Sequence, residues 1–73
     1  MKKRYDNKQI AKALKHFGFF HERQKGSHMV YRHCETRRVC VVVRKHGELR
    51  RGTMKNILLQ AGISQVSFEE FFK

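Results

Sequence analysis

Residues 25–44 read KGSHMVYRHCETRRVCVVVR, and this stretch decides the fold. It begins with a glycine turn and ends in the β-branched run 39–44. Short runs of this kind, bounded by turn residues, are typical of β-strands. Residues 27–34 and 39–44 are joined by only four residues, and so short a connection predicts an antiparallel hairpin.

The chain before the hairpin predicts a helix and a further strand. Asp6 followed three residues later by Gln9 is a capping-box pattern. From Ile10 onward, apolar residues recur at i, i+3, i+4 and i+7, which is one helical face, and the glycine that follows supplies a left-handed stop. We therefore expect a helix over residues 7–17 and a strand over 19–24.

The chain after the hairpin predicts a basic loop and two helical segments. Thr53 is a residue type that caps helices, and it precedes a predicted helix over 54–61 that a glycine ends. Ser64 or Ser67 is expected to cap a last helical turn.

The predicted order is α-β-β-β-α with a helical tail, which is an α+β fold. Its three-stranded antiparallel sheet has helices on one face and leaves the other face open. The 73 residues are expected to form one domain, 1–73. We assume a register that pairs Cys34 with Val39, which brings His28 near Lys45.

The charge of the chain points to a polyanionic partner. Seventeen lysines and arginines against six acidic residues give a net charge of +11, and such a field attracts nucleic acid, acidic proteins or membrane surfaces. No apolar run approaches the length of a membrane span. Cys34 and Cys40 lack zinc-type spacing, so we expect free, buried thiols, the reducing cytoplasm, no metal site and no cofactor. Carboxylates are too few for a two-metal nuclease.

His28 follows the glycine turn and has cationic neighbours in the sequence. Cleavage of RNA without a metal needs a base for the 2′-hydroxyl proton, an acid for the leaving oxygen, and cations for the developing charge. Histidine suits the first two tasks, and lysine and arginine the third. A phosphate can also rest on the backbone N–H groups of the turn. From residue types alone, an exposed strand histidine more often has no catalytic role, so both interpretations remain open.

The other histidines and the phenylalanines favour structural roles. His16, His21 and His33 have no evident catalytic partner, and His46 reads as a loop residue beside the same sheet edge. Phe17 and one of its phenylalanine neighbours are expected in the core. The aromatic group at 68–72 is expected either in the core or on a partner-binding patch.

Three blocks of the chain give a family resemblance: residues 14–19 (LKHFGF), 23–28 (RQKGSH) and 52–63 (GTMKNILLQAGI). With this order and spacing, the chain resembles the HicA toxins, small endoribonucleases of type II toxin–antitoxin systems. The resemblance implies a double-stranded-RNA-binding-like fold and a catalytic histidine at His28. It also implies cleavage of mRNA and neutralisation by a HicB antitoxin.

The chain departs from the family pattern at two places. Met29 stands where members often have a second histidine, and no proline occurs around Arg44. Neither departure removes His28. The second proton-transfer group stays open among His46, Lys45, Tyr31 and water.

The sequence thus supports three hypotheses. The first is a metal-independent endoribonuclease whose catalytic residue is His28. Its expected RNA-binding residues flank the histidine in the sequence: Arg23, Lys25, Gly26, Ser27, Arg44, Lys45 and His46. The second is a non-catalytic RNA-binding module of the same fold. The third is a protein whose basic face docks an acidic partner. The expected partners are mRNA and a HicB-like antitoxin that masks His28 and the basic face, with no membrane and no small-molecule cofactor.

Overall fold

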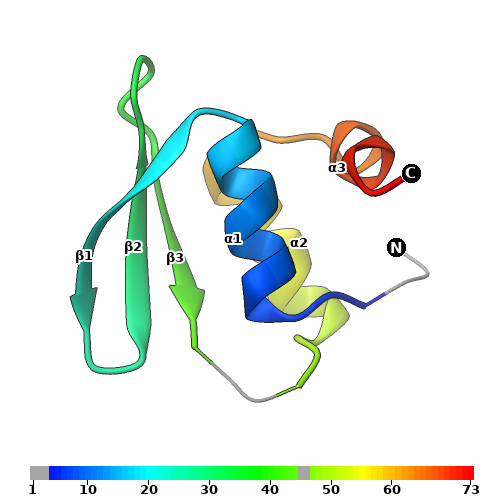
Figure 1. Cartoon of the computed structure of the whole chain (residues 1–73), viewed down its shortest axis with the longest axis horizontal. Helices are drawn as coiled ribbons and strands as arrows, with labels where there is room; N and C mark the ends of the chain where they lie inside the picture. Colours follow the sequence, from blue (N-terminus) through cyan, green and yellow to red (C-terminus); the bar gives the residue numbers. More distant parts are fainter. Residues whose placement is uncertain (1–3, 45–46) are drawn as a thin grey trace.

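A computed structural model describes residues 4–44 and 47–73. Its elements are, in chain order, α1 (Asn7–His16), β1 (Phe19–Lys25), β2 (His28–His33), β3 (Val39–Val43), α2 (Arg51–Ala61) and α3 (Gln65–Phe71). The three strands form one antiparallel sheet in the order β1-β2-β3. Helices α1 and α2 lie together on one side of this sheet, and its other side is open (Figure 1). The predicted α+β fold and antiparallel hairpin are therefore confirmed.

The assumed register of the β2–β3 hairpin is wrong by two residues. Val39 pairs with Arg32 rather than with Cys34, so His28 pairs with Val43. The backbone N–H of Cys34 instead donates to the carbonyl oxygen of Gly18 at 2.9 Å, on the β1 side of the sheet. Because side chains alternate along a strand, a shift of two residues keeps each side chain on its predicted face.

The core lies between the helices and one face of the sheet. Both layers, the helices and the sheet, contribute side chains that point inward. The larger contributors are Ile10 and Leu14 from α1, Tyr31, Cys40 and Val42 from the sheet, and Met54, Ile57 and Leu58 from α2. The Cys40 part of the buried-thiol prediction is confirmed, whereas Cys34 is exposed in the β2–β3 connection. Phe19 is buried and Phe17 half-buried, as expected, while Phe20 lies on the open face.

The N-terminal capping box forms as predicted. The Asp6 carboxylate accepts from the Gln9 N–H at 2.8 Å, and the Gln9 side-chain oxygen accepts from the Asp6 N–H at 3.0 Å. The predicted Thr53 cap is wrong, because α2 already begins at Arg51 and no side chain caps it. Leu49, which is buried and donates its N–H to the Tyr5 carbonyl at 2.9 Å, fixes where the chain enters this helix.

The C-terminal helix α3 closes the core with aromatic rings. The Ser64 hydroxyl caps it by accepting from the Ser67 N–H at 3.1 Å. Of the two predicted caps, Ser64 is therefore the correct one. Phe68 is buried, with its ring centroid 5.0 Å from that of Tyr5, and Phe72 stacks on Tyr5 at 4.6 Å. The aromatic group 68–72 is therefore mostly core.

Candidate functional site

His28 lies at the end of the sheet where β1 turns into β2. It is the first residue of β2, it is exposed, and it pairs with Lys25 on one side and Val43 on the other. Residues paired in this way share one face, with their Cβ atoms about 5 Å apart. A lysine, the histidine and a valine therefore form one row across the open face.

The turn that carries His28 is tight and held from a second direction. Only Gly26 and Ser27 separate the strands, and Gly26 has a φ of 61°, which a glycine adopts without strain. A positive φ at the first central residue alone is typical of a type II′ hairpin turn. The Arg44 N–H donates to the Ser27 carbonyl at 2.6 Å, so β3 fixes the turn relative to the histidine.

A β-bulge at Glu22 brings the cations of β1 onto the histidine's face. The β1–β2 register shifts between His21 and Arg23, and Glu22 is the extra residue. Strict alternation from His21 would turn Arg23 toward the helices. The bulge places Arg23 opposite Val30 instead, on the open face and diagonal to His28, at about 7–8 Å between Cα atoms. Arg23 was predicted from the sequence as a site residue, whereas the bulge that positions it was not.

The extra residue of the bulge is itself held by an ion pair. The Glu22 carboxylate accepts two hydrogen bonds from the Arg32 guanidinium, at 2.6 and 3.2 Å. These bonds hold the pKa of Glu22 below its usual value. Arg32 thus takes most of the Glu22 charge, and among the described residues the neighbouring Arg23 makes no ion pair of its own.

Three of the four described histidines are engaged elsewhere. His33 Nδ1 accepts from the backbone N–H groups of Glu35 and Thr36, both at 3.0 Å. The His21 ring lies edge-on to Tyr31, and the His16 ring packs against an α3 phenylalanine. Within the described part of the chain, the ring of the remaining histidine, His28, has no hydrogen bond or ring contact. Its side chain is exposed, and its ring nitrogens have no partner among the described residues.

A comparison with protein families matches residues 8–63 to the model of the HicA toxin of bacterial toxin–antitoxin systems. This match covers most of the chain. The chain belongs to the HicA toxin family. A comparison with curated protein sequences gave no match. Membership makes the chain a toxin component, which pairs with an antitoxin.

The residues matched to the HicA family include the candidate site but not α3, whose aromatic rings close the core. The match runs from the second residue of α1 to just beyond α2 and includes the turn and His28. Helix α3 lies outside the matched residues. Of the predicted RNA-binding residues, Arg23, Lys25, Gly26, Ser27 and Arg44 surround the turn, and Lys45 and His46 lie outside the described residues.

The structure separates Tyr31 from His28. Tyr31 is buried on the helix side of the sheet, where it contacts His21, and burial raises the pKa of its hydroxyl. His28 projects from the other face. Tyr31 therefore does not share a reaction site with His28, and the alternatives for the second proton-transfer group reduce to Lys45, His46 and water.

Residues 4–44 and 47–73 contain no group of three or more His, Cys, Asp or Glu side chains placed to hold a metal ion. The same described residues include no helix with the length and apolar character needed to span a membrane.

Proposed function

We propose that this toxin is a metal-independent endoribonuclease that cleaves mRNA in the cytoplasm, with His28 as the catalytic residue. The observation that carries the proposal is the exposed, unengaged imidazole of His28, in the same row as Lys25 and beside a glycine turn. An imidazole titrates near neutral pH and can therefore accept or donate the proton in the cleavage step.

The proposed reaction uses the 2′-hydroxyl of the RNA as nucleophile. A base removes its proton, the 2′-oxygen attacks the adjacent phosphorus, and the bond from phosphorus to the 5′-oxygen breaks. An acid then protonates the departing 5′-oxygen. The products are a 2′,3′-cyclic phosphate and a 5′-hydroxyl. His28 serves as the base or the acid, and Lys45, His46 or water serves as the other.

The neighbouring cations stabilise charge on the phosphoryl oxygens. Lys25 lies directly beside His28, and Arg23 lies diagonally from it. Fixed positive charge that faces the developing negative charge lowers the barrier without reorganisation of solvent. Backbone N–H groups at the Gly26-Ser27 turn and the Arg44 side chain are the further proposed contacts for phosphate.

We also propose that the antitoxin partner is HicB-like and covers His28 together with the basic residues around it. Apolar side chains stand next to the histidine on the open face, since Val43 shares its row and Val41 and Val30 form the next row. One exposed valine and two partly exposed ones beside cations suit an acidic protein that buries some apolar area. Occlusion of His28 would then inhibit the toxin directly.

Cleavage of a labelled RNA in excess EDTA tests the proposal. The wild-type protein and the control variant His21→Ala should cut, whereas His28→Ala should bind the RNA without cutting it. A 2′-deoxy substitution at the cleaved nucleotide should abolish cleavage. Dependence on a divalent metal, or full activity of His28→Ala, would refute the mechanism.

The alternative function is a non-catalytic RNA-binding module. This alternative rests on the same fold and charge. A binder of this kind contacts mostly the sugar–phosphate backbone of the RNA. The same experiment separates the two functions. Equal binding by wild type and His28→Ala, with no cleavage of any RNA tested, would favour the module.

A further inference from the structure

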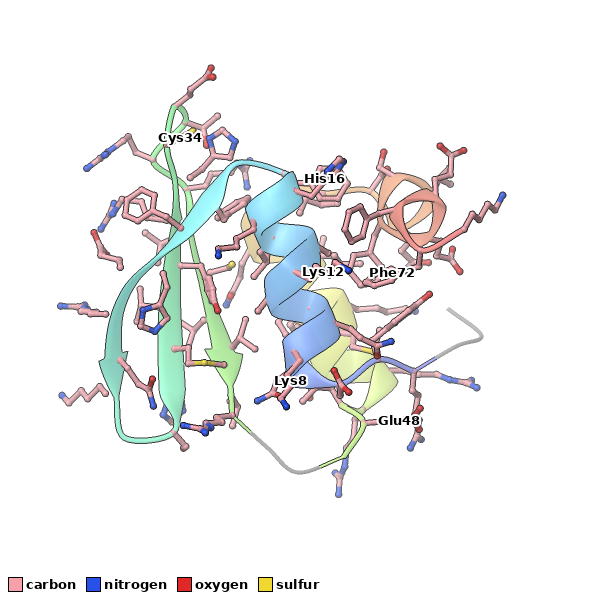
Figure 2. All side chains as sticks on the ribbon, in the orientation of Figure 1. Lys8, Lys12, His16, Cys34, Glu48 and Phe72 are labelled. Atoms are coloured by element: carbon pink, nitrogen blue, oxygen red, sulfur yellow. The ribbon has the colours of Figure 1, made fainter. Side chains whose placement is uncertain are left out.

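Helix α1 presents a row of lysines that the proposed site does not use. Lys8, Lys12 and Lys15 are all exposed, and their spacing of four and three residues places them on one side of the helix. Figure 2 shows Lys8 and Lys12 one above the other along α1. Ala11 lies at the edge of this row, where it is partly buried and packs against the core.

The row of lysines leads into a hollow at the end of the sheet. This hollow has a volume of about 730 Å³ and is lined by residues of α1, β2 and the chain after β3: Asp6, Asn7, Lys8, Ala11, Met29, Arg44 and Gly47. Met29 follows His28 directly in β2, and the Arg44 N–H is bound to Ser27. The hollow therefore connects the lysines of α1 with the turn that carries the histidine.

The charge of the hollow favours an anion. Lys8 and Arg44 are two cations in its lining, against one carboxylate, Asp6. The Asp6 carboxylate already accepts from the Gln9 N–H at the first turn of α1. Its charge is thus partly compensated by the helix, whereas no ion pair occupies Lys8 or Arg44 among the described residues.

We propose that the lysine row of α1 (Lys8, Lys12 and Lys15), continued by Arg44 in the hollow, binds the sugar–phosphate backbone of RNA. His28 projects from the other face of the sheet, so the bound RNA passes around the end of the sheet between the row and the cleaved bond. The inference rests on the proposed function, because it takes RNA as the ligand. It adds a substrate requirement: an RNA that reaches from the sheet end along α1, which spans about 10 Å between Lys8 and Lys15.

The chemistry of the row favours RNA over an acidic protein. Stable protein interfaces depend on buried aromatic or apolar anchors, and the exposed side chains of this row are all lysines. Lysine contacts phosphate as a mobile point charge and needs no fixed geometry. The exposed valines that suit a protein partner lie on the other side of the sheet, around Val43.

The salt dependence of RNA binding tests whether RNA binds along the lysine row. The binding constant of a labelled single-stranded RNA is measured over a range of salt concentrations with His28→Ala, so that the RNA stays intact. The test variant adds Lys8→Gln, Lys12→Gln and Lys15→Gln. A control variant with the same loss of charge adds Arg37→Gln, Lys55→Gln and Lys73→Gln instead. Circular dichroism checks that both variants fold.

Each lost phosphate contact lowers the slope of log K against log salt by about 0.7 for a single strand, so the test variant should lose about 2 in slope. The control variant should lose well under 1. Equal losses in the two variants would overturn the proposal, since binding would then follow net charge alone. Cleavage by the wild type is measured separately. Its absence would refute the nuclease, whereas the slopes would still show whether RNA binds along the lysine row.

Discussion

The side-chain oxygen of Gln60 accepts a hydrogen bond from the backbone N–H of Val41 at 3.1 Å. Strand β3 is an edge of the sheet, and the N–H of Val41 points away from β2. The same helical residue also accepts from Arg38 through its backbone oxygen, at 3.3 Å. Helix α2 thereby occupies the middle of an edge that would otherwise offer its backbone to another strand.

Gln60→Ala should therefore weaken this edge. Loss of one hydrogen bond is expected to lower the free energy of unfolding by about 1 kcal/mol. The Val41 amide should exchange its hydrogen faster, which NMR detects residue by residue. Leu59→Ala, at an exposed neighbouring position of α2, is the control. Equal exchange rates at Val41 in both variants would show that Gln60 does not protect the edge.

Gly18 and Gly26 offer a matched pair of substitutions. Both have a positive φ, 92° and 61°, so alanine at either position costs about 1–2 kcal/mol of backbone strain. A Cβ at Gly18 would also lie 2.8 Å from Nε2 of His33, whereas at Gly26 it would meet nothing within 4 Å. Gly18→Ala should thus lower the thermal midpoint more than Gly26→Ala. The reverse order would contradict the described position of the His33 ring.

The two cysteines should differ in reactivity toward a thiol reagent. Burial raises the pKa of the Cys40 thiol to about 11, so almost no thiolate forms there at pH 8. Cys34 is exposed in the β2–β3 connection. A spectrophotometric titration should find one reactive thiol in the folded protein and two in denaturant. Cys34→Ser should remove the fast reaction, and its persistence in that variant would contradict the burial of Cys40.

The aromatic closure by α3 should contribute strongly to stability. Phe68 is buried with 1% of its surface exposed, and Phe68→Ala is expected to cost about 3–5 kcal/mol. Val66 is 67% exposed on the same helix, so Val66→Ala should change little. Urea denaturation measures both. A small effect of Phe68→Ala would mean that α3 does not pack against Tyr5 in solution.

The bulge residue gives a pH-dependent prediction. Because Arg32 lowers the pKa of Glu22 in the folded protein, this pair stabilises the fold above the ordinary glutamate pKa of about 4.3. That contribution is lost as pH falls through the lower folded value. Glu22→Gln should therefore lower the urea midpoint at pH 7 and leave it nearly unchanged in strong acid. An equal loss at both values would exclude the ion pair as the cause.

Elements with local signals were predictable from the sequence. The Asp6 and Gln9 pair marks the start of α1 because both partners of its capping box lie within one turn. The β-branched run marks β3, and Gly26 marks the hairpin. Each of these features depends on residues close in the chain, so spacing alone is informative.

Elements set by distant contacts were not predictable. Thr53 has the residue type of a cap, yet α2 starts at Arg51 because Leu49 is buried and bound to Tyr5, more than forty residues away. The hairpin register depended on Cys34 bonding toward Gly18 and on Arg37 adopting a left-handed φ of 65°, which is uncommon outside glycine.

The candidate site was predictable as a set of residues but not as an arrangement. The glycine turn locates His28, and the charge pattern locates Lys25 and Arg23. Only the bulge at Glu22 explains why both cations share the histidine's face, and a single inserted residue leaves no distinct mark in one sequence.

The row of Lys25, His28 and Val43 stands outside the core, on the uncovered side of the sheet. Its side chains can therefore change with little effect on folding. In evolutionary terms, the proposed activity and the architecture can then be inherited separately. Under the proposed function, a single codon change at position 28 would yield a harmless protein of unchanged shape. If such a protein still bound the antitoxin, it would draw the antidote away from any active copy in the same cell.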